Sequence, residues 1–135
     1  MTTKRNIHGS WKMSFNNRIL TSEFTGLSNR EGSEAWFEDL KNLILSSPDQ
    51  DSSPWVMLND VRDWQMASLD SWGTNNHIID WMSKHQCALF AIVFSKKIQS
   101  FSVEKGINDK SIVQFFFYHE AAYQACREKL SDAQK

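Results

Sequence analysis

The longest apolar run in the chain is Cys87-Ala88-Leu89-Phe90-Ala91-Ile92-Val93-Phe94-Ser95, and no polar residue alternates within it. A half-exposed strand alternates apolar and polar residues, whereas an uninterrupted run is typical of a strand covered on both faces. We therefore predict that this run is the central strand of a sheet, with the other elements packed around it.

The chain has 135 residues, which is the usual size of one domain. We predict a single domain over residues 1–135 with an ordered core from about residue 9 to 131. Its net charge of −1 gives no electrostatic footprint for nucleic acid. Met1–Arg5 lacks the apolar core of a signal peptide, and no apolar run is long enough to span a bilayer. We expect a cytoplasmic protein, with peripheral membrane contact as a further option.

Local periodicity predicts the remaining elements. Trp11, Met13 and Phe15 alternate with polar residues before a turn at Asn16-Asn17, and an extended segment follows, so a hairpin is expected at one edge of the sheet. Further strands are predicted at 55–58 and 112–118, and helices at about 33–44, 68–85, 96–105 and 120–131. We expect charge after Leu58 to mark the exit of that strand, and Gly106 to follow the third helix.

This order of elements predicts an α/β fold: an N-terminal hairpin, then alternating strands and helices, in a mixed, mostly parallel sheet of about five strands. Eight apolar residues are expected to be buried in it: Leu40, Leu58, Ile79, Leu89, Ile92, Phe94, Val113 and Phe115. Cys87 and Cys126 lie in apolar contexts and are expected to be buried free thiols.

Three segments give the sequence a family resemblance. They are Phe24-Thr25-Gly26 leading into an amphipathic helix, Phe90-Ala91-Ile92-Val93, and Val113-Gln114-Phe115-Phe116 before an alanine-rich helix. Between about Gly9 and Leu130 the chain resembles the SpoIIAA-like proteins, which share the fold of the STAS domains, the anti-sigma-factor antagonists. That design is also similar to the lipid-binding CRAL-TRIO domains.

The resemblance raises the question of a phosphorylation site. The antagonists carry a phosphorylatable serine in an Asp-Ser-Ser-Gly motif, and the nearest match here is Asp70-Ser71-Trp72-Gly73. Trp72 stands in place of the second serine, which is the one that the family phosphorylates. We therefore interpret Asp70 and Ser71 as residues of a capped first helical turn rather than as a phosphoswitch.

The carboxyl ends of parallel strands meet at one edge of a sheet, where ligands commonly bind. The polar residues expected at that edge are Asn59, Asp60, Arg62, Asp63, Ser95, Lys96, His119 and Glu120. An acid, a hydroxyl and a base could suit phosphoryl acceptance, but a divalent cation would need further acids. Because strand ends are polar in any soluble α/β domain, we favour solvated loop residues.

No catalytic signature, phosphate-binding glycine loop or metal-ligand spacing occurs in the sequence. His77 and Asp80 are three residues apart, but His85 lies more than two turns from His77, so no metal site is expected. We predict a protein that is not an enzyme and uses no cofactor.

The segment from Lys96 to Gly106 is expected to be a mobile flap over an apolar pocket. Its anchors would be only Ile98 and Phe101, on one stripe, so its packing would be weaker than that of the other helices. When the flap lifts, these two residues would become exposed beside Lys96, Lys97 and Lys105, which together make an interfacial surface. An ordinary short crossover helix is the alternative.

Three function classes stay open at this point. We expect first a non-catalytic domain that binds an apolar small molecule or a membrane surface. The alternative is a partner-binding regulator of the anti-sigma-factor-antagonist type, and the third is an enzyme or phosphoacceptor that uses the strand-end residues. A homodimer is compatible with each of them, and nothing in the sequence identifies the ligand or the partner.

Overall fold

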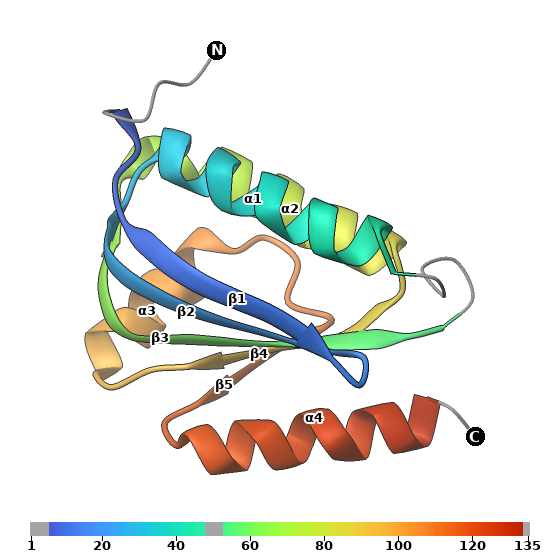
Figure 1. Cartoon of the computed structure of the whole chain (residues 1–135). Coiled ribbons are helices and arrows are strands. Elements are labelled where there is room, and N and C mark those ends of the chain that lie inside the picture. The colour runs from blue at the N-terminus through green and yellow to red at the C-terminus, as the bar shows by residue number, and fades with distance from the viewer. Residues whose placement is uncertain (1–5, 48–52, 134–135) are drawn as a thin grey trace.

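The computed structural model describes residues 6–47 and 53–133, and the elements in these ranges follow the expected order. They are β1 (Ser10–Asn16), β2 (Ile19–Ser28), α1 (Arg30–Leu45), β3 (Trp55–Ala67), the short 3-10 helix η2 (Leu69–Ser71), α2 (Trp72–Lys84), β4 (Cys87–Val93), α3 (Lys97–Gly106), β5 (Val113–Phe116) and α4 (His119–Ala133) (Figure 1).

The five strands lie in the order β1-β2-β3-β4-β5. β1 and β2 are antiparallel, and every other neighbouring pair is parallel. The hairpin turn falls on Asn17 and Arg18, one residue later than expected, with φ angles of 53° and 65°. Two left-handed residues at this place are typical of a type I′ turn, whose twist matches that of the strands. The predicted mixed, mostly parallel sheet with the hairpin at its edge is confirmed.

The central strand of the sheet is β3, so the prediction that Cys87–Ser95 occupies the centre is wrong by one position. The prediction that β3 ends at Leu58 is also wrong, because the strand continues to Ala67. β3 leaves β4 after Asp60 but stays paired with β2 as far as Ala67. Charged residues are tolerated on this extension because it has one neighbouring strand and not two.

Helices cover both faces of the sheet (Figure 1). α1 and α2 lie side by side on one face, α3 lies at the carboxyl end of the parallel strands, and α4 lies alone on the opposite face. This arrangement explains why β4 is apolar on both sides. On the α4 side, the buried residues are Ile19, Val56, Leu58, Leu89, Ala91, Val93, Ala122, Cys126 and Leu130.

Six of the eight residues predicted to be buried are buried: Leu40, Leu58, Ile79, Leu89, Ile92 and Phe94. Val113 and Phe115 are only partly buried, because β5 is a four-residue edge strand. The prediction of buried free thiols is confirmed for Cys87 and Cys126. Burial raises the pKa of both thiols to about 12, so they stay protonated at neutral pH.

Candidate functional site

The carboxyl edge of the sheet brings together some of the predicted polar residues. The Asp60 carboxylate accepts hydrogen bonds from Arg62 Nη2 at 2.7 Å and from Arg62 Nε at 2.9 Å. Ser95 Oγ donates to the Arg62 carbonyl at 2.6 Å. His119, the first residue of α4, lies close enough to act electrostatically on Asp60. The hydroxyl and the carboxylate of this constellation are therefore engaged in contacts within the fold.

Burial of Asp60, which is 6% exposed, opposes its ionisation, but the hydrogen bonds and charge of Arg62 outweigh burial. The net effect is a pKa below the ordinary value of 3.8. The same pair raises the pKa of Arg62, through its hydrogen bond with Asp60 and the Asp60 charge. Asp63 and Glu23 add to the negative field around Arg62. The arrangement is an ion pair that stabilises the extension of β3.

We expect Asp60→Asn to be less stable than the wild type at neutral pH by about 1 kcal/mol, since the half-exposed Arg62 is partly screened by solvent. A carboxyl group whose pKa is lowered by folding stabilises the fold at any pH above its ordinary pKa. This contribution is lost as the pH falls through the lowered pKa. The difference between the two proteins should therefore shrink below about pH 4 in urea unfolding. A constant difference across this range would contradict the ion pair, and Asp63→Asn is the control at an exposed neighbour.

Gln99 is a buried residue at this edge that sequence reasoning missed. Its side-chain carbonyl accepts hydrogen bonds from the backbone N–H groups of Ser95 and Lys96 at 2.9 Å and 3.0 Å. Its amide donates to the carbonyls of Val61 and Trp64 at 3.1 Å and 2.9 Å. Gln99 thus caps α3 and ties this helix to the extension of β3. A glutamine three residues after the N-cap is the one sequence signal that pointed to this role.

The prediction that Ile98 and Phe101 anchor α3 is wrong. These two side chains are 60% and 61% exposed, whereas Gln99 and Val103 are buried. The helix is oriented by the hydrogen bonds of Gln99, which turn its large apolar residues outward. Its other end is also held, because Asn76 of α2 bonds the Gly106 carbonyl and the Asn108 N–H, each at 2.9 Å. Hydrogen bonds therefore hold both ends of α3, although Val103 is its one buried apolar side chain, and the mobility of the segment 96–106 stays a prediction.

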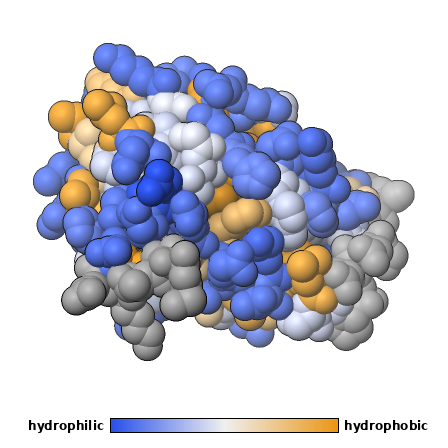
Figure 2. Space-filling view, turned by 90° about the horizontal axis from the view of Figure 1, so that it is seen from above, coloured by the Kyte–Doolittle hydropathy of each residue, from blue (hydrophilic) through white to orange (hydrophobic). Residues whose placement is uncertain are grey.

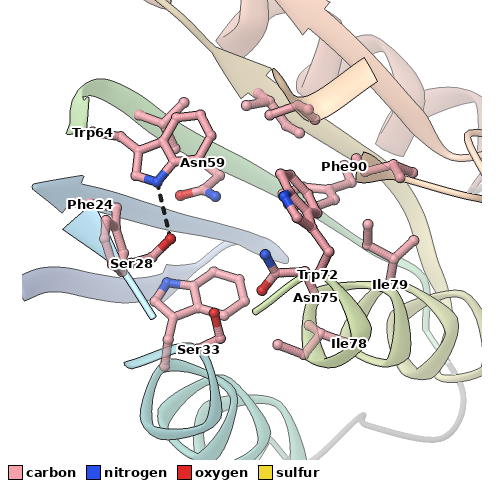
Figure 3. Close-up of a pocket in the computed structure, with 15 residues that line it drawn as sticks. Phe24, Ser28, Ser33, Asn59, Trp64, Trp72, Asn75, Ile78, Ile79 and Phe90 are labelled. Atoms are coloured by element: carbon pink, nitrogen blue, oxygen red, sulfur yellow. Dashed lines mark hydrogen bonds between the residues drawn. The ribbon is translucent and has the colours of Figure 1, made fainter. Parts of the chain in front are cut away.

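An apolar pocket does lie beside α3, between the sheet and the helices α1 and α2 (Figure 3). We call it the tryptophan pocket. Its volume is about 100 Å³, and it is lined by Phe24, Ser28, Ser33, Trp36, Asn59, Val61, Trp64, Trp72, Asn75, Ile78, Ile79, Phe90, Ile92, Val103 and Ile107. The segment 96–106 contributes Val103 to this lining, so the predicted apolar pocket next to it exists.

The three tryptophans of the pocket are held in place by specific contacts. Trp36 Nε1 donates to Ser22 Oγ at 2.9 Å, and Trp64 Nε1 donates to Ser28 Oγ at 3.1 Å (Figure 3). The Trp72 ring packs on Gly106, where a Cβ atom would lie 2.3 Å from Trp72 Cδ2. Gly106 is the last residue of α3 rather than the residue after it, and close packing explains the glycine.

Asn59 is the polar residue at the base of the tryptophan pocket. It lies within β3, on the face of the sheet that carries Met57 and Val61, and not at the strand end where it was predicted. Its neighbours across the sheet are Ser22 on β2 and Ile92 on β4. Asn59 Oδ1 is buried and has no hydrogen-bond partner within the described residues. An unsatisfied buried acceptor of this kind calls for an explanation.

Ser71 lies in η2, directly before α2, and is fully buried. Its hydroxyl donates to the Ser68 carbonyl at 2.8 Å, while Ser68 Oγ donates to Asp70. Trp72, which stands where the resemblance to the antagonists would place a phosphorylatable serine, lines the tryptophan pocket. The Ser71 hydroxyl is therefore inaccessible to solvent and hydrogen-bonded within the helical turn that precedes α2.

We expect Ser71 to stay unmodified when the folded protein is incubated with a serine kinase of the anti-sigma type, because a kinase cannot reach a fully buried hydroxyl. Peptide mapping by mass spectrometry measures the phosphate, and the unfolded chain serves as the control substrate. Stoichiometric phosphate on Ser71 of the folded protein would contradict this reading.

The histidines considered for a metal site make aromatic contacts. His77 packs edge-on against Phe37 with ring centroids 5.8 Å apart, and His85 stacks on Trp81 at 4.1 Å. Asp80 pairs with Lys84 at 2.9 Å. Within residues 6–47 and 53–133, no group of three or more histidine, cysteine, aspartate or glutamate side chains could hold a metal ion. In the same ranges, no helix has the length and hydropathy needed to cross a membrane.

No family model matches the sequence, and no curated protein matches it either. The structure is similar to solved structures. An anti-sigma factor antagonist from Mycobacterium paratuberculosis matches with a TM-score of 0.66 at 9% identity, over 94% of this chain and 99% of the other. A protein with a SpoIIAA-like fold from Shewanella loihica matches with a TM-score of 0.61 at 16% identity, over 93% and 98%.

The anti-sigma factor antagonist SpoIIAA in its unphosphorylated form also matches, with a TM-score of 0.61 at 8% identity, over 87% of this chain and 98% of the other. Identities this low establish the fold. The chain thus has the SpoIIAA-like fold that the sequence resemblance implied, and the likeness to CRAL-TRIO domains stays an expectation.

Proposed function

We propose that this protein is a non-catalytic regulatory domain that acts by binding a protein partner through α3. We call the residues Lys97, Ile98, Phe101 and Lys105 the α3 face. All four are exposed. Two structural neighbours are anti-sigma factor antagonists, a function that works through protein partners, and this supports a regulatory function of the same class.

The observation that carries the proposal is the reversed orientation of α3. A surface helix normally turns its apolar stripe to the core and its polar residues to solvent. Here the buried positions include a glutamine, and an isoleucine and a phenylalanine point outward. Exposed apolar side chains that are grouped together mark interaction sites, whereas single exposed apolar residues are normal on any protein surface.

The surroundings of α3 extend this apolar surface. Phe117 and Tyr118, which follow β5, are 43% and 77% exposed. Phe117 packs on Phe94 with ring centroids 6.0 Å apart, so it lies at the same edge of the sheet from which α3 starts. Figure 2 shows mostly hydrophilic atoms over the face of the molecule that α1 and α2 cover, with hydrophobic atoms in several separate places on it.

The charges indicate the kind of partner. Lys97 and Lys105 flank the apolar pair on α3, while the nearby Glu104 is paired with Lys110 at 3.9 Å. A partner with an apolar cleft for Phe101 and an acidic rim would complement this surface. Association with an anionic membrane would use the same residues, but two apolar side chains contribute only about 3 to 6 kcal/mol, which is little for stable anchoring.

Co-purification from the cells that produce the protein tests the proposal. We expect a protein partner to be retained by the wild type and lost, by about tenfold or more, from Phe101→Ser, because buried aromatic anchors dominate interfaces. Tyr123→Ser is the matched control, since Tyr123 is a 42% exposed aromatic on α4. Equal retention of the partner by both variants would contradict the proposal. The proposal would also be contradicted if the binding that depends on Phe101 were seen only with anionic vesicles or only with a second copy of the chain.

A further inference from the structure

We propose that the tryptophan pocket is a binding site for a neutral, single-ring aromatic molecule that donates a hydrogen bond to Asn59. The pocket is separate from the α3 face, because α3 contributes Val103 to the pocket and turns Ile98 and Phe101 the opposite way. The two sites can therefore be tested independently.

The first step is the unpaired acceptor. Asn59 occupies a position in β3 whose neighbours on the same face, Met57 and Val61, are apolar core residues. Leaving its Oδ1 buried without a partner destabilises the fold, and an apolar residue of similar size would remove that cost. Figure 3 shows the amides of Asn59 and Asn75 facing the same space from opposite sides. Because Asn59 Oδ1 is buried as the side chain stands, an incoming donor would reach it after rotation of the Asn59 amide, and would also face a second amide that can donate or accept.

The second step is the chemistry of the walls. Every residue that lines the pocket within the described part of the chain is uncharged, so a charged ligand would be buried without a counter-ion. Five of the lining residues are aromatic, namely Phe24, Trp36, Trp64, Trp72 and Phe90. Aromatic faces and edges favour a flat aromatic ring as their partner.

The third step is size and rigidity. The cavity volume is about 100 Å³. An engineered apolar cavity of about 150 Å³ holds benzene, so one ring is the upper limit here, and it would lie partly in the opening of the pocket with its donor group directed toward Asn59. Because the rings of Trp36 and Trp64 are hydrogen-bonded and Trp72 is packed on Gly106, the walls are in place before any ligand enters.

The test uses phenol as the probe, toluene as the same ring without a donor, and benzoate as a charged analogue. Binding is followed by the indole N–H signals in NMR spectra, assigned with single Trp→Phe variants. The chain has its own controls, because Trp11, Trp55 and Trp81 do not line the pocket. Phenol is expected to shift the signals of Trp36, Trp64 and Trp72, to bind about tenfold more tightly than toluene, and to leave the other three unchanged.

The variant Asn59→Leu separates a ligand site from a structural role. We expect it to raise the thermal midpoint of the free protein and to abolish the preference for phenol over toluene. The proposal is overturned if phenol shifts all six indole signals alike, if benzoate binds as well as phenol, or if no signal moves at millimolar phenol. If Asn59→Leu instead lowered the thermal midpoint and left the preference for phenol over toluene unchanged, Asn59 would have a structural role or would bind water, and the proposal would be wrong.

Discussion

Replacing Leu20 with asparagine is expected to unfold the protein or nearly so, with a loss of about 3 to 6 kcal/mol in the free energy of unfolding. Leu20 is fully buried on β2. Its neighbours across the sheet are Phe15 on β1 and Met57 on β3, which offer the new amide no partner. The cost combines lost apolar burial with an unsatisfied polar group, and domains of this size are stable by only about 5 to 15 kcal/mol.

Leu69→Asn is the matched control for this substitution, because Leu69 is 93% exposed in η2. The same chemical change should alter stability there by no more than about 0.5 kcal/mol. Urea unfolding followed by tryptophan fluorescence measures both variants. Similar midpoints for the two would contradict the placement of Leu20 in the core between β1 and β3.

Replacing Gln99 with leucine is expected to cost about 2 to 4 kcal/mol and to release α3 locally. Leucine is close in size to glutamine, so the loss would come from hydrogen bonds and not from packing. The substitution leaves the N–H groups of Ser95 and Lys96 without their acceptor and the carbonyls of Val61 and Trp64 without their donor. Buried backbone groups deprived of a partner cost about 1 to 3 kcal/mol each, and water entry at this edge would reduce the sum.

Gln124→Leu is the control for Gln99, because Gln124 is exposed on α4 and makes a hydrogen bond to Glu128 at 3.0 Å. In Gln99→Leu, the backbone amides of residues 97–106 should lose protection from hydrogen exchange, while those of α1 should stay protected. In Gln124→Leu, the amides of both segments should stay protected. If α3 exchanges as rapidly in the wild type as in Gln99→Leu, the helix is mobile as the sequence suggested, and the role assigned to Gln99 is wrong.

The fold was predictable where hydrophobic pattern and element order decide it. The uninterrupted run at Cys87–Ser95 implied a strand covered on both faces, and the structure places β4 between helices on either side. The position of that strand within the sheet was not predictable, because composition reports burial and not strand order. The length of β3 was missed because its charged residues after Asp60, which are Arg62 and Asp63, lie where β3 has β2 as its neighbouring strand and no longer β4, and such a charged segment resembles a loop in the sequence.

The orientation of α3 shows where pattern reasoning fails. A helical stripe with Ile98 and Phe101 is expected to face the core, because apolar burial usually outweighs single polar contacts. Here six hydrogen bonds converge on the side chain of Gln99, and they favour the orientation in which this residue faces the sheet. Such a role depends on backbone groups from distant segments, and the sequence does not reveal which carbonyls a glutamine will meet.

The residues that line the tryptophan pocket could not be predicted from the sequence for a related reason. An apolar pocket was expected beside the segment 96–106, but its walls come from six elements and the segments that follow them. Asn59 was assigned to the strand end because it precedes a charged run. Only the continuation of β3 places it inside, where its unpaired oxygen becomes informative.

Site-specific photo-cross-linking tests the central proposal, a protein partner bound through α3, most directly. A photoreactive phenylalanine analogue replaces Phe101 in one protein and Tyr123 in another, and both are irradiated in the cells that produce the chain. We predict a discrete cross-linked protein from position 101, absent from position 123 and lost when Ile98 is also changed to asparagine. Cross-links to one partner from position 123 and none from position 101 would contradict the account.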